Sequence, residues 1–229
     1  MKRLFGLTMI LTLVFPLATW SLLYDFEDPA QLDDWTLIQG TWSIIDGELD
    51  GRGPQAGQPG VMIVLSDNTW NDEWKDYTIE FDAKILEDSE DAGIVFRWQN
   101  ADPADLRYHL YRIDNWPRGF GQKQAEGWVA DEDGGAREMM GQTKVDIEPD
   151  IWYKFRVEVV GSNFKCYLDD ELMFELDANG YSWGKIGFRM WNSHARYDNL
   201  SITGPGIPGA AVEPSGKLTA TWGQIKVHH

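Results

Sequence analysis

The residues best suited to ligand chemistry are arginines and aromatic residues that alternate with apolar residues in predicted β-strands. In the segments from Ala92 to Asn100 and from Lys185 to Trp191, these side chains point to the face of the strand opposite the apolar side chains. Aromatic faces stack on the C–H groups of sugars, and arginine donates paired hydrogen bonds to hydroxyls or a carboxylate. The side chains predicted to share one exposed sheet face are Arg97, Tyr111, Arg189 and Trp191, with Trp116 and Trp128 in rim loops. This pattern predicts a glycan-binding surface; the alternative is that these arginines only pair with glutamates across strands.

Two carboxylates, Glu80 and Asp82, are the weak candidates for catalysis. They lie two residues apart in the alternating segment Tyr77 to Ile85, so they share one face of a strand and a general acid/base pair is geometrically possible. The alternative is a solvated strand face on which both acids pair with Lys154 or Arg156. The single cysteine, Cys166, falls on an inward phase and is predicted to be a buried, inert thiol.

The composition restricts the class of ligand. The formal net charge is −17, which argues against nucleic acid and against anionic lipid head groups. The twelve tryptophans exceed what one core of this size needs, so several are expected to form an interface or a platform for a flat, amphipathic ligand such as a sugar ring. A carbohydrate is therefore the expected partner.

The chain divides into three predicted parts. Residues 1–21 resemble a secretory signal, with Lys2 and Arg3 before an apolar run that is too short to span a bilayer. Residues 22–203 are expected to form one domain, and residues 204–229 a Gly/Pro linker with a short tail. We therefore expect a secreted or periplasmic protein without stable membrane insertion after signal cleavage; an uncleaved membrane anchor is the alternative.

The elements that position the candidate residues are short strands. Strands are predicted at 35–38, 41–45, 48–50, 77–85, 93–99 and 107–114, a fully buried strand at 61–65, weaker strands at 119–125 and 138–144, and a meander at 151–202. No helical period continues beyond the signal segment. We therefore predict an all-β fold, a two-sheet antiparallel jelly-roll sandwich in a single domain.

The order of several motifs resembles the laminin-G-like members of the concanavalin A-like lectin/glucanase superfamily. These motifs are YTIEFDAKI, AGIVFRWQN, WYKFRVEVVG and GKIGFRMWNSHARYDNLSI. Within that superfamily the chain is similar to secreted bacterial 3-keto-disaccharide hydrolase-type domains. The resemblance implies a curved jelly roll that binds or cleaves glycans on its concave face or at its rim loops. The E-x-D-x-x-E pattern of its retaining glycosidases is incomplete here, because Glu80 and Asp82 lack the third acid.

The resemblance also implies a structural calcium ion. Glu27 and Asp198 come from opposite ends of the domain, but the first and last strands of a sandwich often lie side by side. Two carboxylates completed by backbone carbonyls suit Ca²⁺. The alternative is that these acids cap turns or pair with Arg196.

The function predicted first is a carbohydrate-binding module. Two alternatives stay open: a hydrolase that acts on a glycoside or a 3-keto-disaccharide, and an adhesion module that binds protein.

Overall fold

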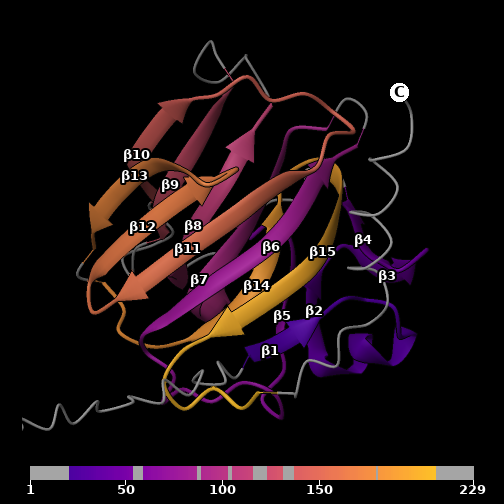
Figure 1. Ribbon diagram of the computed structural model, residues 1–229, viewed down its shortest axis with the longest axis horizontal. Helices are drawn as coiled ribbons and strands as arrows, with labels where there is room; N and C mark the ends of the chain where they lie inside the picture. Colours follow the sequence, from indigo (N-terminus) through magenta and orange to yellow (C-terminus); the bar gives the residue numbers. More distant parts are fainter. Residues whose placement is uncertain are drawn as a thin grey trace, which may run out of the picture.

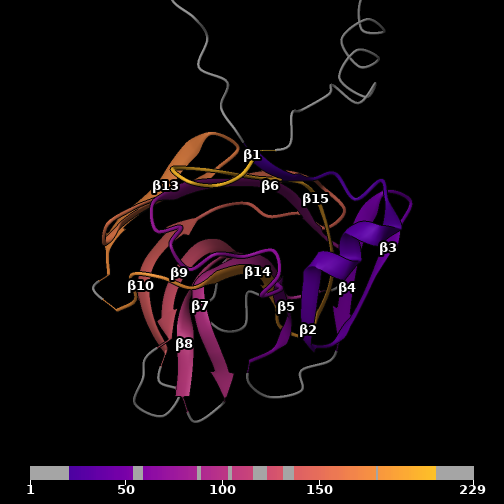
Figure 2. The same cartoon turned by 90° about the horizontal axis from the view of Figure 1, so that it is seen from below.

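The computed structural model describes residues 21–53, 59–86, 89–102, 105–115, 123–130, 137–178 and 180–209. In this part of the chain, two antiparallel sheets pack face to face in two layers (Figures 1 and 2). This arrangement confirms the predicted all-β sandwich. The predicted signal segment up to residue 20, Trp116 and the tail from residue 210 lie outside the described residues.

One layer, sheet A, has eight strands among the described residues. In spatial order they are β13 (Glu171–Asp177), β12 (Asn163–Leu168), β11 (Tyr153–Val160), β6 (Tyr77–Ile85), β15 (Ser193–Thr203), β4 (Glu48–Gly53) and β3 (Thr41–Ile45), with β1 (Ser21–Tyr24) also paired to β15. A 3₁₀ helix, η1 (Pro29–Asp34), follows β1. Both ends of the described domain meet in this sheet, because Ser21 pairs with Thr203.

The other layer, sheet B, has seven strands in the described part. In spatial order they are β10 (Arg137–Lys144), β9 (Gln124–Ala130), β8 (Asp105–Asp114), β7 (Asp91–Asp102), β14 (Lys185–Met190), β5 (Val61–Leu65) and β2 (Trp35–Gln39). β14 therefore lies beside β7, although more than eighty residues separate them in sequence. Sheet B carries the candidate site.

Alternating side chains explain why the two layers adhere. In β6 every second residue is buried, and β11 repeats the pattern beside it. Phe81 stacks on Phe155 with ring centres 4.6 Å apart, and Phe188 of sheet B stacks on Tyr197 of sheet A at 4.2 Å. The apolar core therefore lies between the sheets, as the alternation predicts.

Tight turns set the register of two hairpins in sheet A. Asp46 and Gly47 have φ values of 56° and 74°, and Asp169 and Asp170 have 50° and 66°. Consecutive residues with positive φ are typical of the type I′ turns that match the twist of antiparallel strands. These turns join β3 to β4 and β12 to β13, where the sequence predicts breaks.

The strand predicted at 119–125 lies mostly outside the described residues, and β9 runs from Gln124 to Ala130. Charged and polar residues on one face of β9 hid its alternation, because the outer face of this strand carries a polar network.

In the described residues, no helix is long and apolar enough to cross a membrane.

Candidate functional site

The two faces of sheet B are both largely buried. The inner face packs on sheet A, while the outer face carries a second apolar cluster with each member at most 1% exposed. This outer apolar cluster consists of Met62, Val64, Val95, Leu106, Tyr108 and Leu110, with Ile38, Trp98 and Trp128 packed against it.

Beside the outer apolar cluster lies a group of five charged side chains from β7, β8, β9 and β14. This outer-face charge network consists of Asp91, Arg112, Asp114, Glu126 and Arg189. Three of its members, Asp91, Glu126 and Arg189, are at most 1% exposed. Charged groups are seldom buried so far unless they are paired.

Arg112 forms the centre of the outer-face charge network. Its Nε donates to Glu126 Oε2 at 2.8 Å, its Nη2 donates to Asp114 Oδ2 at 2.9 Å, and its Nη1 donates to Asp91. Burial alone would lower the pKa of Arg112, but Asp91, Glu126 and Asp114 together outweigh burial and raise it. Arg112 therefore stays protonated and is surrounded by three carboxylates.

Asp91 connects Arg112 to the second arginine. Arg189 Nη1 lies 3.3 Å from Asp91 Oδ2, and Arg189 Nε donates to Pro59 O at 3.0 Å. The backbone N–H of Trp191 donates to Asp91 Oδ1 at 2.5 Å. Two arginines against three carboxylates leave the network with a formal charge of −1, from +2 − 3.

Two glycines make room for the arginines. Gly93 pairs with Arg112 on one side and Arg189 on the other, and a methyl group on Gly93 would collide with the Arg112 side chain. Gly60 has a φ of 91°, and a side chain there would meet the Trp191 ring and Arg189 Nε. Glycine at both positions is therefore required by this packing.

Two tryptophan rings border the outer-face charge network, and each lies near an arginine. The guanidinium carbon of Arg112 is 5.7 Å from the ring centre of Trp128, and that of Arg189 is 5.2 Å from Trp191. Trp128 Nε1 donates to Glu126 Oε2 at 2.6 Å, which fixes the orientation of its ring. Both rings are half-buried, so part of each aromatic surface stays accessible.

The structure brings together three of the predicted ligand-binding residues, Trp128, Arg189 and Trp191. The placement of Trp128 in a rim loop was wrong, because Trp128 lies within β9 and pairs with Leu110.

The structure adds Asp91, Arg112 and Glu126, which the sequence did not single out. Their signal in the sequence is short, because Arg112 and Asp114 share a face only at the end of β8 and Gln124 and Glu126 only at the start of β9. Such polar pairs are also typical of a solvated strand face.

Arg97 is a correction, because it was predicted to stand on the exposed face but is 2% exposed. A bulge interrupts the pairing of β7 between Phe96 and Asn100, and Arg97 adopts a φ of 51° there. Its Nη1 donates to Tyr181 O at 2.7 Å and its Nη2 to Gly161 O at 2.6 Å. Burial lowers the pKa of Arg97. Arg97 therefore holds together the loops that contain Gly161 and Tyr181 at the end of the sandwich.

Tyr111 is a second correction. It pairs with Ile94, is fully buried in the core between the sheets, and donates its hydroxyl to Tyr167 O at 3.1 Å. Both phases of β8 contain bulky apolar residues, so alternation could not tell its inner face from its outer face.

The two catalytic candidates lie on the other sheet. Glu80 and Asp82 point outward from β6, where Glu80 pairs with Lys154 at 3.7 Å and Asp82 accepts a hydrogen bond from Asn199 Nδ2 at 2.8 Å. Burial, more than any neighbouring charge, raises the pKa of Asp82. The pair is therefore separate from the outer-face charge network, and Glu80 forms the surface ion pair expected under the alternative interpretation.

Of the two predicted calcium ligands, Asp198 lies on β15 of sheet A and Glu27 lies between β1 and η1. Asp198 is half-buried, and burial followed by the charges of Asp82, Glu48 and Asp25 raises its pKa to about 6. Glu27 is exposed and its carboxylate packs against Gly47. Within the described ranges, no three His, Cys, Asp or Glu side chains form a metal-binding group. Calcium bound by Glu27, Asp198 and backbone carbonyls stays a prediction.

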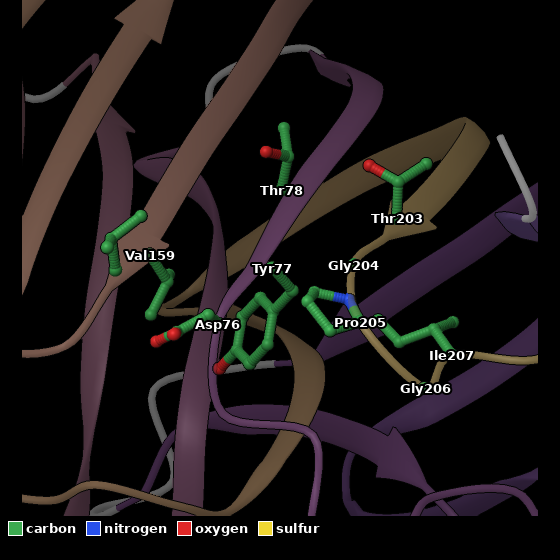
Figure 3. A pocket seen from close by; sticks show the side chains of 10 residues that line it. Asp76, Tyr77, Thr78, Val159, Thr203, Gly204, Pro205, Gly206 and Ile207 are labelled. Atoms are coloured by element: carbon green, nitrogen blue, oxygen red, sulfur yellow. The ribbon is translucent and has the colours of Figure 1, made fainter. Parts of the chain in front are cut away.

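A pocket of about 700 Å³ lies elsewhere, at the ends of β6, β11 and β15 (Figure 3). Tyr77, Val159 and Ile207 give it mostly apolar walls. Asp76 already accepts a hydrogen bond from the Gly161 N–H at 2.9 Å. This pocket offers fewer directional groups than the outer face of sheet B.

The fold places the protein in the class of concanavalin A-like sandwiches. The outer face of its sheet B carries a buried arginine–carboxylate network beside two tryptophans. Within this class, the chain belongs to the family of 3-keto-alpha-glucoside-1,2-lyase-like domains, whose model matches residues 20–203. This match confirms the resemblance found in the sequence.

Individual proteins are more distant relatives. A levanase of Bacillus subtilis (strain 168) is 24% identical over 180 residues, which are 75% of this chain and 23% of the levanase. The chain thus spans about a quarter of that enzyme. The carbohydrate binding module CBM66 from Bacillus subtilis has a TM-score of 0.62 at 22% identity and covers 75% of this chain and 96% of its own. A Bacillus subtilis protein of unknown function with a galectin-like fold has a TM-score of 0.58 at 13% identity, with coverages of 80% and 94%. These structures confirm the fold.

Proposed function

We propose that this domain binds carbohydrate on the outer face of sheet B, at the outer-face charge network and its two tryptophans. The observation that carries the proposal is the buried ion-pair network on a sheet face that does not join the two sheets. The fully buried members hold Arg112 and Asp114, whose side chains are 13% and 10% exposed, in positions suited to directional hydrogen bonds with hydroxyl groups. The half-buried rings of Trp128 and Trp191 provide faces for stacking on sugar C–H groups.

The relatives support the same class of ligand. One solved neighbour is named as a carbohydrate binding module, and the curated relative is a levanase. Levan and other fructans are therefore the first polysaccharides to test. Export from the cytoplasm, predicted from residues 1–21, is part of this proposal, and mass spectrometry of the mature N-terminus would check it.

A glycan array with the purified domain tests the proposal. We expect binding by the wild type, a loss of about tenfold or more in affinity for Trp128→Ala, and no change for Trp152→Ala. Trp152 is the matched control because it is 37% exposed and contacts Lys84 on the other sheet. Equal losses in both variants, or no binding by the wild type, would contradict the proposal.

The alternative function is a hydrolase or lyase, which the family name suggests. A reducing-sugar assay on every bound glycan separates the two functions. Binding without turnover is the expected result, because the carboxylates of the outer-face charge network are held by Arg112 and Arg189. If the domain hydrolyses a bound glycan and Glu80→Gln abolishes this activity, the functional site would instead lie on sheet A.

A further inference from the structure

A second pocket lies on the outer face of sheet B, at the opposite end of β7 from Asp91. Its volume is about 340 Å³, within the range of small-molecule sites. Trp98, which lines this pocket, lies seven residues along β7 from Asp91, so roughly 20 Å of strand separates it from the outer-face charge network. The outer apolar cluster continues into the pocket through Val64.

An exposed tryptophan on a fixed backbone forms one wall of this pocket. Trp183 is 42% exposed, and its carbonyl oxygen accepts a hydrogen bond from Gln99 Nε2 at 2.9 Å. The next residue, Gly184, has a φ of 133° and packs against the backbone of Arg97 and Trp98. The bulge that buries Arg97 therefore also holds the loop of Trp183. A ring on a fixed loop loses little conformational entropy when a ligand stacks on it.

Polar groups surround the ring of Trp183. Lys185 Nζ pairs with Asp67 Oδ1 at 2.5 Å and lies 5.9 Å from the ring centre of Trp98. Asp72 lines the pocket, and its carboxylate makes no hydrogen bond or ion pair with another described residue. Trp98 Nε1 is buried and has no hydrogen-bond partner in the described part of the chain. A buried donor of this kind costs stability unless a ligand or water accepts from it.

We propose that this pocket is a second saccharide-binding site, in which Trp183 stacks on a sugar ring while Asp72 and Lys185 hydrogen-bond to its hydroxyls. The inference rests on the proposed function, because it assigns the same class of ligand to another part of the same face. One lysine against two aspartates gives the pocket a formal charge of −1, which favours neutral sugars over acidic ones. Two sites on one face would strengthen binding to a polysaccharide that reaches both.

The indole N–H signals of Trp183 and Trp128 in ¹H–¹⁵N NMR spectra report on the two sites separately. Each signal is assigned by its loss in Trp183→Phe or Trp128→Phe. D-Glucose, D-fructose, D-galactose and levan oligosaccharides are then titrated one at a time. We expect at least one of these sugars to shift the Trp183 signal in a saturable way.

The outcomes distinguish the two proposals. A shift of the Trp128 signal alone would overturn the second site and leave the proposed function standing. A shift of the Trp183 signal alone would support the second site and contradict the first, and shifts of neither would contradict both.

Affinity measurements on variants complete the test. We expect Trp183→Ala to weaken binding to levan or another bound polysaccharide by about tenfold, and Asp72→Asn to weaken it while the ring stays in place. Trp152→Ala should bind like the wild type. Unchanged affinity in both pocket variants would overturn the second site.

Discussion

Replacing Asp91 with asparagine removes the charge that Arg112 and Arg189 share. Asp91 is completely buried, and its carboxylate accepts hydrogen bonds from both arginines and from the Trp191 N–H. Removing one partner of a buried ion pair costs about 3–5 kcal/mol, because the remaining charge stays buried without compensation. We therefore expect Asp91→Asn to lower the free energy of unfolding by this amount.

Urea denaturation monitored by tryptophan fluorescence measures the effect directly. For a domain of this size, the expected loss also lowers the melting temperature by roughly 6–20 °C. Glu80→Gln is the matched control, because the Glu80 side chain is 41% exposed and its ion pair with Lys154 spans 3.7 Å. The control should change the free energy of unfolding by less than about 1 kcal/mol. A loss below about 1 kcal/mol for Asp91→Asn would refute the reasoning, since it would mean that water already compensates the arginines.

Three further predictions concern the rest of the domain. If Glu27 and Asp198 hold calcium, a chelator should lower the melting temperature of the wild type but not of Asp198→Asn, and identical melting curves of the wild type with and without chelator would exclude the ion. Burial, followed by the charge of Arg97, lowers the pKa of His109 to about 3. Because this value lies below the pKa of about 6.5 in an unfolded chain, the contribution of neutral His109 to stability should be complete above pH 6.5 and be lost as the pH falls towards 3. Urea titrations at pH 8 and pH 4.5 should therefore show a smaller loss of stability for His109→Gln than for the wild type. Burial also raises the pKa of Cys166, so its thiol should react with Ellman's reagent only after unfolding, and rapid reaction of the native protein would contradict this packing.

The strands of sheet A could be predicted well, because their inner and outer phases differ sharply. β6 and all but the last residue of β11 alternate between apolar and polar residues, and the turn at Asp169 and Asp170 separates two strands as expected. An alternating pattern of this kind is contained within one strand, so such a strand can be predicted without knowing which strands pair with it.

Sheet B was harder to predict, because both of its faces are buried. Arg97 was assigned to the wrong face, since a bulge shifts the phase of β7 and no sequence period marks it. Tyr111 was misassigned because apolar residues occupy both faces of β8. Arg112 and Asp91 were missed because their pairing depends on which strands are neighbours.

The neighbour of β7 that matters most for the site is β14, which brings Arg189 to Asp91 from 98 residues away in sequence. Arg189, Trp191 and Trp128 could be selected from residue type and phase alone. The contacts that unite them are long-range and appear only in the fold.

A crystal structure of the domain with a glycan selected on the array tests the central claim most directly. The account predicts ligand density against Trp128 and Trp191, with hydroxyl groups in hydrogen-bond contact with Arg112 or Asp114 of the outer-face charge network. Density beside Glu80 and Asp82 on sheet A, or only in the pocket of Figure 3, would contradict it.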